Sequence, residues 1–284
     1  MRMCMRPLCA VVISLTVVGL ELDARADGRL LRERLSGLRV AAHRGGYPFA
    51  DSNTIERFRS ALRDGADIVE TDLQVSSDGV PFLLHDSVLE RVSDCKGPIS
   101  DLPARAIERC RLNGLSHGPE RFEDALKWAR GRVVIDAEFK SLAVVRPAIE
   151  LVRRYDAYEW VYFQVKDGWS YYREARARDP YVALEAAPAG ADGERKLTEL
   201  LALDDPRLMI IQLHPNLLTT ENLRRIRESG RLASIDAWRV GSERRWSFGP
   251  LRRTAACDAV FARGFDIAIS NAPRPCAQQR DAMR

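Results

Sequence analysis

Two carboxylates and two histidines in the first third of this sequence are spaced as the parts of one reactive site would be. Glu70 and Asp72 lie two residues apart in an apolar, β-branched run, so a strand directs both side chains to the same side. Asp78-Gly79 predicts a tight turn into a second run, which ends at His85. The second histidine, His43, follows an earlier apolar run at residues 38–42 and precedes Arg44. Carboxylates, imidazoles and a guanidinium are the groups of a metal-assisted phosphoryl site.

A further charged group ends the apolar run at residues 133–139. Asp136, Glu138 and Lys140 share one face of this predicted strand. A protein interior does not bury such charges without partners or a metal ion. We therefore expect carboxylates that bind a hard cation, Ca²⁺ or Mg²⁺. The alternative is an ion-pair network in which Arg44 and Lys140 neutralise the acids.

The elements that must position these residues alternate regularly. We expect strands at residues 38–42, 67–75, 133–139, 160–165, 181–186, 208–213, 232–237 and 265–270, and helices at about 55–64, 142–154, 168–178, 193–203 and 219–229. Shorter helices are expected at residues 28–37, 103–110 and 122–129 and in the second half of residues 249–263. Alternation at this spacing means parallel strands joined by crossover helices. Eight such units predict an α/β fold, the (β/α)8 TIM barrel, whose catalytic residues lie at the C-terminal ends of the strands. A doubly wound open sheet is the alternative, but the chain has no Gly-x-Gly-x-x-Gly turn.

The first 26 residues have the layout of a secretory signal peptide. Arg2 and Arg6 precede an apolar run from Leu8 to Leu20, and Ala24-Arg25-Ala26 offers a small-x-small cleavage site. We expect export to the periplasm or beyond, and a single domain over residues 27–284 with an insertion at about 87–120. An uncleaved anchor is the alternative, although the apolar run is shorter than the about 20 residues that span a bilayer.

Four cysteines lie beyond that segment, and they allow three pairings. We expect the local pairing, Cys95 with Cys110 and Cys257 with Cys276, because each pair flanks a short segment. Disulfides persist in an oxidising compartment; buried free thiols are the alternative. The spacing contains no Cys-x-x-Cys and therefore does not indicate a zinc site.

The overall composition is that of an ordinary soluble protein. Of 284 residues, 46% are hydrophobic and 30% are charged, and the net charge of +4 is spread along the chain without a long Lys/Arg block. This pattern argues against a dedicated nucleic-acid binder. The partner we expect is a small molecule, with no stable membrane span in the mature protein.

Taken in order, the motifs resemble those of the glycerophosphodiester phosphodiesterase family. They are Ala42-His43-Arg44-Gly45-Gly46, Asn53-Thr54-x-x-x-Phe58, Gly65-Ala66-Asp67-x-x-Glu70-x-Asp72-Leu73, Asp78-Gly79-x-Pro81, His85-Asp86-x-x-Leu89-x-Arg91, Glu138-Phe139-Lys140 and Gly264-Phe265-Asp266 through Ser270. Together they extend over about residues 38–275, nearly all of the expected mature chain.

The resemblance implies a TIM barrel that hydrolyses a glycerophosphodiester to glycerol 3-phosphate and an alcohol. It implies a divalent metal ion with three carboxylate ligands: Glu70, Asp72 and Glu138. It implies His43 and His85 as general acid and base, without saying which is which. It further implies phosphate contacts from Arg44 and Lys140. Neither direct attack by water nor attack by a substrate hydroxyl to give a cyclic phosphate is singled out.

The chain departs from the family pattern around the expected pocket. Ser52 and Asn271 stand where the family usually has Glu and Asp. These departures leave two other functions open. One is a phosphodiesterase of the same barrel type that acts on lysophospholipids or another headgroup diester. The other is a secreted, non-catalytic binding protein.

Gln164, Glu185 and His214, at strand ends, are further candidates for the pocket lining. Trp238 is a candidate wall for the alcohol or glycerol part of the substrate, with ordinary core packing as the alternative. Tyr47, Phe49 and the aromatic residues at 169–172 are candidates for the rim, with ordinary helix and loop packing as the alternative.

Overall fold

The strands form one closed sheet. The computed structural model describes residues 28–46, 52–166, 169–240 and 257–284, and the expected signal peptide lies outside them. The strands are β1 (Arg39–Ala42), β2 (Ile68–Val75), β3 (Pro81–Leu83), β4 (Val134–Phe139), β5 (Val161–Lys166), β6 (Ala183–Ala187), β7 (Leu208–Gln212), β8 (Leu232–Asp236) and β9 (Ile267–Ser270).

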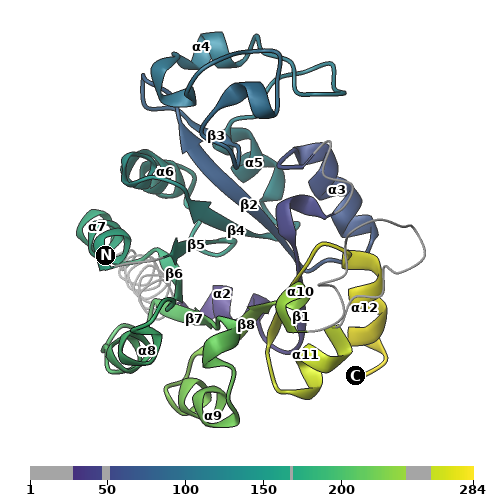
Figure 1. Ribbon diagram of the computed structural model, residues 1–284, viewed down its shortest axis with the longest axis vertical. Helices are drawn as coiled ribbons and strands as arrows, with labels where there is room; N and C mark the ends of the chain where they lie inside the picture. Colours follow the sequence, from purple (N-terminus) through teal and green to yellow (C-terminus); the bar gives the residue numbers. More distant parts are fainter. Residues whose placement is uncertain (1–27, 47–51, 167–168, 241–256) are drawn as a thin grey trace, which may run out of the picture.

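All of these strands except β3 pair in parallel around a ring. The order is β1-β9-β8-β7-β6-β5-β4-β2, and β1 also pairs with β2, which closes the barrel. In Figure 1 the strands surround the centre and most of the helices lie outside them. The predicted (β/α)8 barrel is therefore confirmed, and the open-sheet alternative is wrong.

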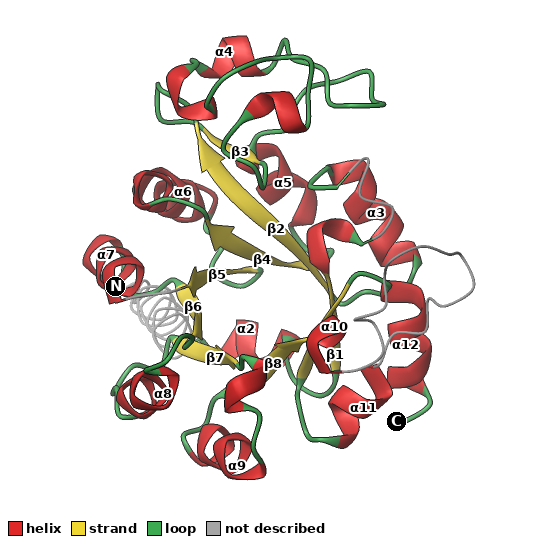
Figure 2. Cartoon of the chain, viewed as in Figure 1, coloured by secondary structure: helices red, strands yellow, loops and turns green. Residues whose placement is uncertain are grey.

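Most of the helices cover the outside of the barrel, as Figure 2 shows, whereas α2 (Arg29–Arg34) is seen within the ring of strands. Besides α2, the helices of the barrel are α3 (Ile55–Arg63), α5 (Phe122–Ala129), α6 (Leu142–Tyr155), α7 (Trp169–Arg178), α8 (Gly193–Leu201), α9 (Thr220–Glu228), α10 (Ala237–Val240), α11 (Cys257–Ala262) and α12 (Pro273–Asp281). The sequence did not lead us to expect α10 or α12. The Thr54 hydroxyl caps α3 by accepting a hydrogen bond from the backbone N–H of Arg57, 3.1 Å away.

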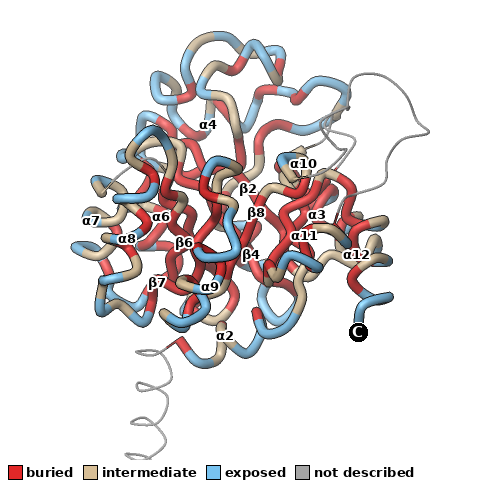
Figure 3. Tube along the Cα trace, turned by 60° about the horizontal axis from the view of Figure 1, so that its bottom comes forward, coloured by how far each residue is buried: buried red, intermediate tan, exposed pale blue. Residues whose placement is uncertain are grey.

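The core has two layers, because a barrel strand alternates its side chains between the helices outside and the interior. The buried strands and the helix faces that meet them are visible in Figure 3. Inside the barrel, Ile68 and Val134 pack with Leu31 and Leu35 of the α2 segment, all of them buried. The α2 segment therefore closes one end of the barrel with apolar side chains, and the charged strand ends lie at the other.

The insertion follows β2, which has eight residues. The end of β2 pairs antiparallel with β3, with Leu73 opposite Leu83. The chain then forms η3 (Leu89–Arg91), η4 (Ile99–Asp101) and α4 (Ala104–Ile107). These elements enclose a small apolar core of the insertion and lie at the top of Figure 1. The helix α4 is shorter than the 103–110 helix that the sequence suggests.

Both expected disulfides are present. Cys95 is bonded to Cys110 within the insertion, and Cys257 is bonded to Cys276 between α11 and α12. The local pairing is therefore confirmed, and the free-thiol alternative is wrong. Within the described part of the chain, no helix is both long enough and apolar enough to cross a membrane.

Candidate functional site

Three carboxylates meet at the C-terminal ends of two neighbouring strands. The parallel register of β2 and β4 places Asp72 beside Glu138, and Glu70 lies two residues before Asp72 on the same strand. All three side chains are buried, and one oxygen of each lies within 4.8 Å of the others. Asp94 also lies near two sulfur atoms, but these belong to the Cys95–Cys110 disulfide and are not available as ligands. The described residues thus hold one acidic cluster suited to a cation.

Cationic side chains compensate this cluster. Lys140 Nζ lies 2.8 Å from Asp72 Oδ1 and 2.6 Å from Glu138 Oε1. Arg44 Nε lies 3.0 Å from Asp72 Oδ2. Lys166, at the end of β5, forms an ion pair with Glu138 Oε2. The ion-pair network that the sequence left as an alternative is thus present, on the same carboxylates that we expect to bind metal.

The charges act differently on two of the acids. Burial, followed by the negative charges of Asp72 and Glu138, raises the pKa of Glu70 well above its usual range. Burial alone would raise the pKa of Asp72 too, but Lys140 and Arg44 lower it to about 2. Even with these lysine and arginine side chains nearby, the pKa of Glu70 stays raised. The three buried carboxylates therefore favour the binding of one more cation. Because all the donors are carboxylate oxygens, the set fits a hard divalent ion.

A short helical turn fixes the approach of the next two groups. His43–Gly45 form η1 directly after β1, and Arg44 adopts a left-handed conformation with φ of 53°. Its backbone N–H donates to Glu70 Oε2 at 2.8 Å. Gly45 follows with φ of 81°, and a Cβ there would lie 2.6 Å from Arg57 Cγ. The His-Arg-Gly sequence thus supplies the reactive side chains and also the glycine that this left-handed turn needs.

Asn53 also holds Asp72 in place, through the same oxygen that Arg44 contacts. Its Nδ2 donates to Asp72 Oδ2 at 2.9 Å, and its Oδ1 accepts from Thr71 Oγ1 at 2.8 Å. The backbone N–H of Asp72 also donates to Asn53 Oδ1, at 3.2 Å. Asn53 is buried and left-handed, with φ of 59°. It is therefore a positioning residue, a role that the motif in the sequence did not reveal.

The two histidines have different partners. His43 Nδ1 lies 2.6 Å from Asn271 Oδ1, which can only accept, so Nδ1 carries the hydrogen. His43 Nε2 lies 4.0 Å from Glu70 Oε2. Burial and then the charge of Arg44 lower the pKa of His43 to about 4. His85 instead donates from Nδ1 to the carboxylate Oδ1 of Asp86 at 2.6 Å. A carboxylate partner stabilises positive charge on the ring that it orients.

These residues border one polar cavity of about 420 Å³. The predicted site residues that line it are His43, Arg44, Glu70, His85, Glu138, Lys140, Gln164 and Trp238. Asp72 lies directly behind this surface and is fully buried. The ring of Trp238 lies 4.7 Å from that of His43, centroid to centroid. The structure thus brings the predicted site residues together.

Gln164 and His214 illustrate the limits of the strand-end argument. Gln164 borders the cavity, but it is almost fully buried, and its Nε2 donates to Asp136 Oδ2 at 2.9 Å. His214 follows β7, yet its Nδ1 is paired with Asn216 Oδ1 at 2.6 Å and it does not line the cavity. Tyr47 and Phe49, considered as rim residues, lie outside the described residues.

The sequence reasoning missed Lys166 and Asp236, which also line the cavity. Burial alone would lower the pKa of Lys166, but the carboxylates of Glu138 and Glu70 raise it above its ordinary value. Lys166 lies two residues after Gln164 on the same strand, so period-2 spacing was the available signal.

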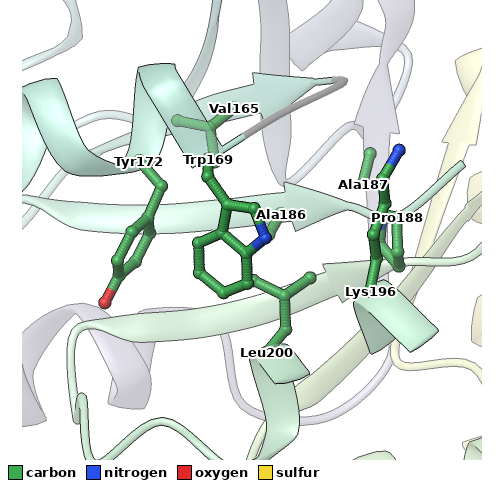
Figure 4. A pocket seen from close by; sticks show the side chains of 8 residues that line it. All are labelled: Val165, Trp169, Tyr172, Ala186, Ala187, Pro188, Lys196 and Leu200. Atoms are coloured by element: carbon green, nitrogen blue, oxygen red, sulfur yellow. The ribbon is translucent and has the colours of Figure 1, made fainter. Parts of the chain in front are cut away.

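A second hollow, between α7 and α8, is apolar and far smaller. Figure 4 shows Trp169, Tyr172 and Leu200 lining it, and its volume is about 30 Å³. This space is too small for a substrate. The aromatic residues of this helix therefore pack locally and do not rim the site.

A buried acid deeper in the barrel predicts a pH effect on stability. Glu185 of β6 is fully buried, its Oε1 accepts from the Ser234 hydroxyl, and burial raises its pKa to about 7. Its Oε2 and Gln164 Oε1, on neighbouring strands in register, are buried acceptors without a hydrogen-bond donor. A proton on Glu185 removes the charge from a carboxylate whose Oε2 has no donor in this buried position. The neutral form is therefore the one that suits the folded protein.

We expect Glu185→Gln to remove part of the loss of stability with rising pH. Between pH 4.5 and about 7 the folded protein retains a proton that the unfolded chain releases, so stability falls across this window and levels off above it. The substitution should stabilise the protein at pH 8 by up to about 3 kcal/mol relative to its effect at pH 4.5. Urea unfolding at both pH values measures this. An equal effect of the substitution at the two values would contradict the assignment.

Comparison with known proteins supports the motif assignment. Residues 43–172 match the model of the glycerophosphoryl diester phosphodiesterase family. Glycerophosphodiester phosphodiesterase 1 of Bos taurus is 41% identical over 78 residues, which cover 28% of this chain and 23% of that protein. The match thus spans about a quarter of the length of this curated relative.

Solved structures are similar over most of the chain. A glycerophosphodiester phosphodiesterase from Agrobacterium tumefaciens has a TM-score of 0.70 at 19% identity, over 84% of this chain and 99% of that one. A phosphodiesterase from Oleispira antarctica, solved with the product sn-glycerol-3-phosphate, has a TM-score of 0.67 at 17% identity, over 86% and 97%. These likenesses support the barrel fold, and the resemblance inferred from the motifs is confirmed.

Proposed function

We propose, because residues 43–172 carry the glycerophosphodiester phosphodiesterase pattern, that this protein hydrolyses glycerophosphodiesters to glycerol 3-phosphate and an alcohol. The observation that carries the proposal is the convergence of two histidines and four cationic side chains on one polar cavity, with the cluster of three carboxylates in and directly behind its wall. This combination serves phosphoryl transfer, which needs charge stabilisation at phosphate and proton transfer at two oxygens. A protein that only binds its ligand has no need of two differently partnered imidazoles.

The acidic cluster is the proposed metal site. Glu70, Asp72 and Glu138 would hold Ca²⁺ or Mg²⁺, which when bound places positive charge beside the non-bridging phosphate oxygens. Arg44, Lys140 and Lys166 now neutralise the same carboxylates. Once a cation shares that task, their N–H groups can make charge-assisted hydrogen bonds to the phosphate.

The two histidines divide the proton transfers. His43, neutral near pH 7 because of its lowered pKa, takes the proton from the attacking oxygen of water or of the neighbouring substrate hydroxyl. His85, oriented by Asp86, gives a proton to the alcohol oxygen as its bond to phosphorus breaks. The products are then glycerol 3-phosphate, directly or through a cyclic phosphate, and the free alcohol.

The character of the cavity favours a small polar headgroup. Trp238 and Ile269 supply its apolar lining side chains, and the other described lining residues are the two histidines and side chains that are charged or carry amides. A lysophospholipid would need a long apolar groove beside the site. We infer that the protein is exported, since its two disulfides suit an oxidising compartment.

The test is release of glycerol 3-phosphate by the purified protein. Glycerophosphocholine, lysophosphatidylcholine and a chromogenic diester would be offered with Ca²⁺, with Mg²⁺ and with chelator. We expect metal-dependent release from the glycerophosphodiester. Turnover of lysophosphatidylcholine alone would move the substrate to lysophospholipids. No turnover of any diester by folded protein would favour the non-catalytic binding protein.

A further inference from the structure

The polar cavity continues on both sides of His85 into two hollows that border the insertion. The first side chamber, of about 260 Å³, lies between Ser52 and Asn53 of the barrel and Leu112 and Asn113 of the insertion. The second, of about 570 Å³, lies between Val88 and Ser100 of the insertion and Lys140 of the barrel. His85 lines the cavity and both chambers. A group attached to the phosphate therefore has room on the side of His85.

Arg91 is the residue of the insertion best placed to contact such a group. Apart from His85 and Asp86, it is the only described residue that lines both side chambers. Its side chain is 72% exposed, and its Nη1 lies 3.9 Å from Asp86 Oδ2. Asp86 also accepts the hydrogen bond from His85 Nδ1, so its charge is shared. The positive charge of Arg91 is thus only loosely compensated.

The charged side chains that line the two chambers are mainly cationic, and of these Arg44 and Lys140 are paired with the acidic cluster, whereas Arg91 is not. Among the described lining residues the cations are Arg44, Arg91 and Lys140, and the single anion is Asp86. These residues include no aromatic side chain apart from the imidazole of His85. A quaternary ammonium group is typically recognised by aromatic faces. Hydroxyl groups and anions instead suit the donor-only guanidinium of an arginine.

We propose that Arg91 selects the alcohol part of the substrate, favouring alcohols that carry a negative charge or several hydroxyl groups over those with a quaternary ammonium group. The inference rests on the proposed hydrolysis. It follows because a proton donor must reach the leaving oxygen, and His85 borders both chambers. The alcohol released beside His85 then lies within reach of Arg91. The insertion thereby contributes to substrate choice without contacting the acidic cluster.

The experiment compares three diesters of increasing positive charge on the alcohol: glycerophosphoinositol 4-phosphate, glycerophosphoglycerol and glycerophosphocholine. The kcat/KM of each is measured for the wild-type protein, Arg91→Glu, Arg91→Lys and Arg105→Glu. Arg105 is the matched control, because it is an exposed arginine of the insertion that lines neither chamber nor the cavity. Each measurement is repeated in 1 M salt, which screens exposed charges to about 3 Å.

We expect the wild-type protein to prefer the anionic substrate. Arg91→Glu should lower the ratio of kcat/KM for the anionic over the cationic substrate by about fivefold or more, mainly through KM. Arg91→Lys should retain most of the preference, Arg105→Glu all of it, and high salt should weaken it. A ratio in Arg91→Glu that stays within about twofold of the wild type would overturn the inference while leaving the hydrolysis intact. An equal shift in Arg105→Glu would do the same. Hydrolysis of none of the three would overturn the proposed function, and this inference with it.

Discussion

Glu70→Gln is expected to lower affinity for the divalent cation by more than about 100-fold. This loss is larger than the one usually seen when a residue that only hydrogen-bonds to a metal ligand is replaced. The substitution keeps the size of the side chain but replaces a negative carboxylate oxygen by an amide. Hydrolysis should fall by about 10³-fold, because a Lewis-acid cation contributes several kcal/mol to such a reaction. Calorimetric titration with Ca²⁺ and with Mg²⁺ measures affinity independently of activity.

Asp136→Asn is the matched control for this experiment. Asp136 is also a fully buried carboxyl, on the strand that carries Glu138, and burial followed by the charge of Glu185 raises its pKa well above the usual range. Its neutral form resembles asparagine, so we expect cation affinity within about threefold of the wild type. Equal losses in both variants would mean that the barrel interior as a whole, and not the acidic cluster, controls binding.

The parts of the fold that could be predicted are the strands and helices whose apolar residues recur with a regular local period. The eight barrel strands are apolar runs with helical segments between them, and the position of Glu138 at a strand end followed from that pattern. Helix α12 was not predicted because its sequence is mostly polar and its apolar residues do not recur at helical spacing. It is held in place by buried Cys276 and Ala277 and by the disulfide to Cys257. The short α10, which carries Trp238, is a single turn without a periodic pattern.

The site was predictable as a set of residue types and not as a set of contacts. Motif spacing identified His43 and Asp72. The hydrogen bond from Asn53 to Asp72, however, depends on the left-handed backbone conformation of Asn53, which only the folded chain shows. Lys166 escaped because a lysine at a strand end is usually a solvated residue. The role proposed for Arg91 depends on how the insertion folds over the barrel, which its irregular sequence does not reveal.

His43→Ala is expected to lower kcat/KM by about 10²–10⁴-fold, the usual contribution of a positioned acid or base. The wild-type pH profile should assign its role. As a base, His43 must be neutral, so in saturating divalent cation, which keeps Glu70 ionised, activity is lost as pH falls through the His43 pKa of about 4. A bound divalent cation nearby would lower that pKa further, so the acid limb of kcat/KM should lie well below pH 6. An acid limb at or above pH 6.5 would contradict His43 as the base.

Asn271→Asp gives the complementary test of this assignment. Asn271 Oδ1 is the partner of His43 Nδ1, and a carboxylate there keeps the hydrogen bond while adding a negative charge that favours the imidazolium. The acid limb should therefore move upward by about one pH unit, and activity at pH 8 should change far less than in His43→Ala. His214→Ala controls for the loss of an imidazole, since His214 follows a barrel strand but does not line the cavity. If the acid limb of the kcat/KM profile does not move in Asn271→Asp, another group sets the pH dependence. His85 would then be the candidate for the base.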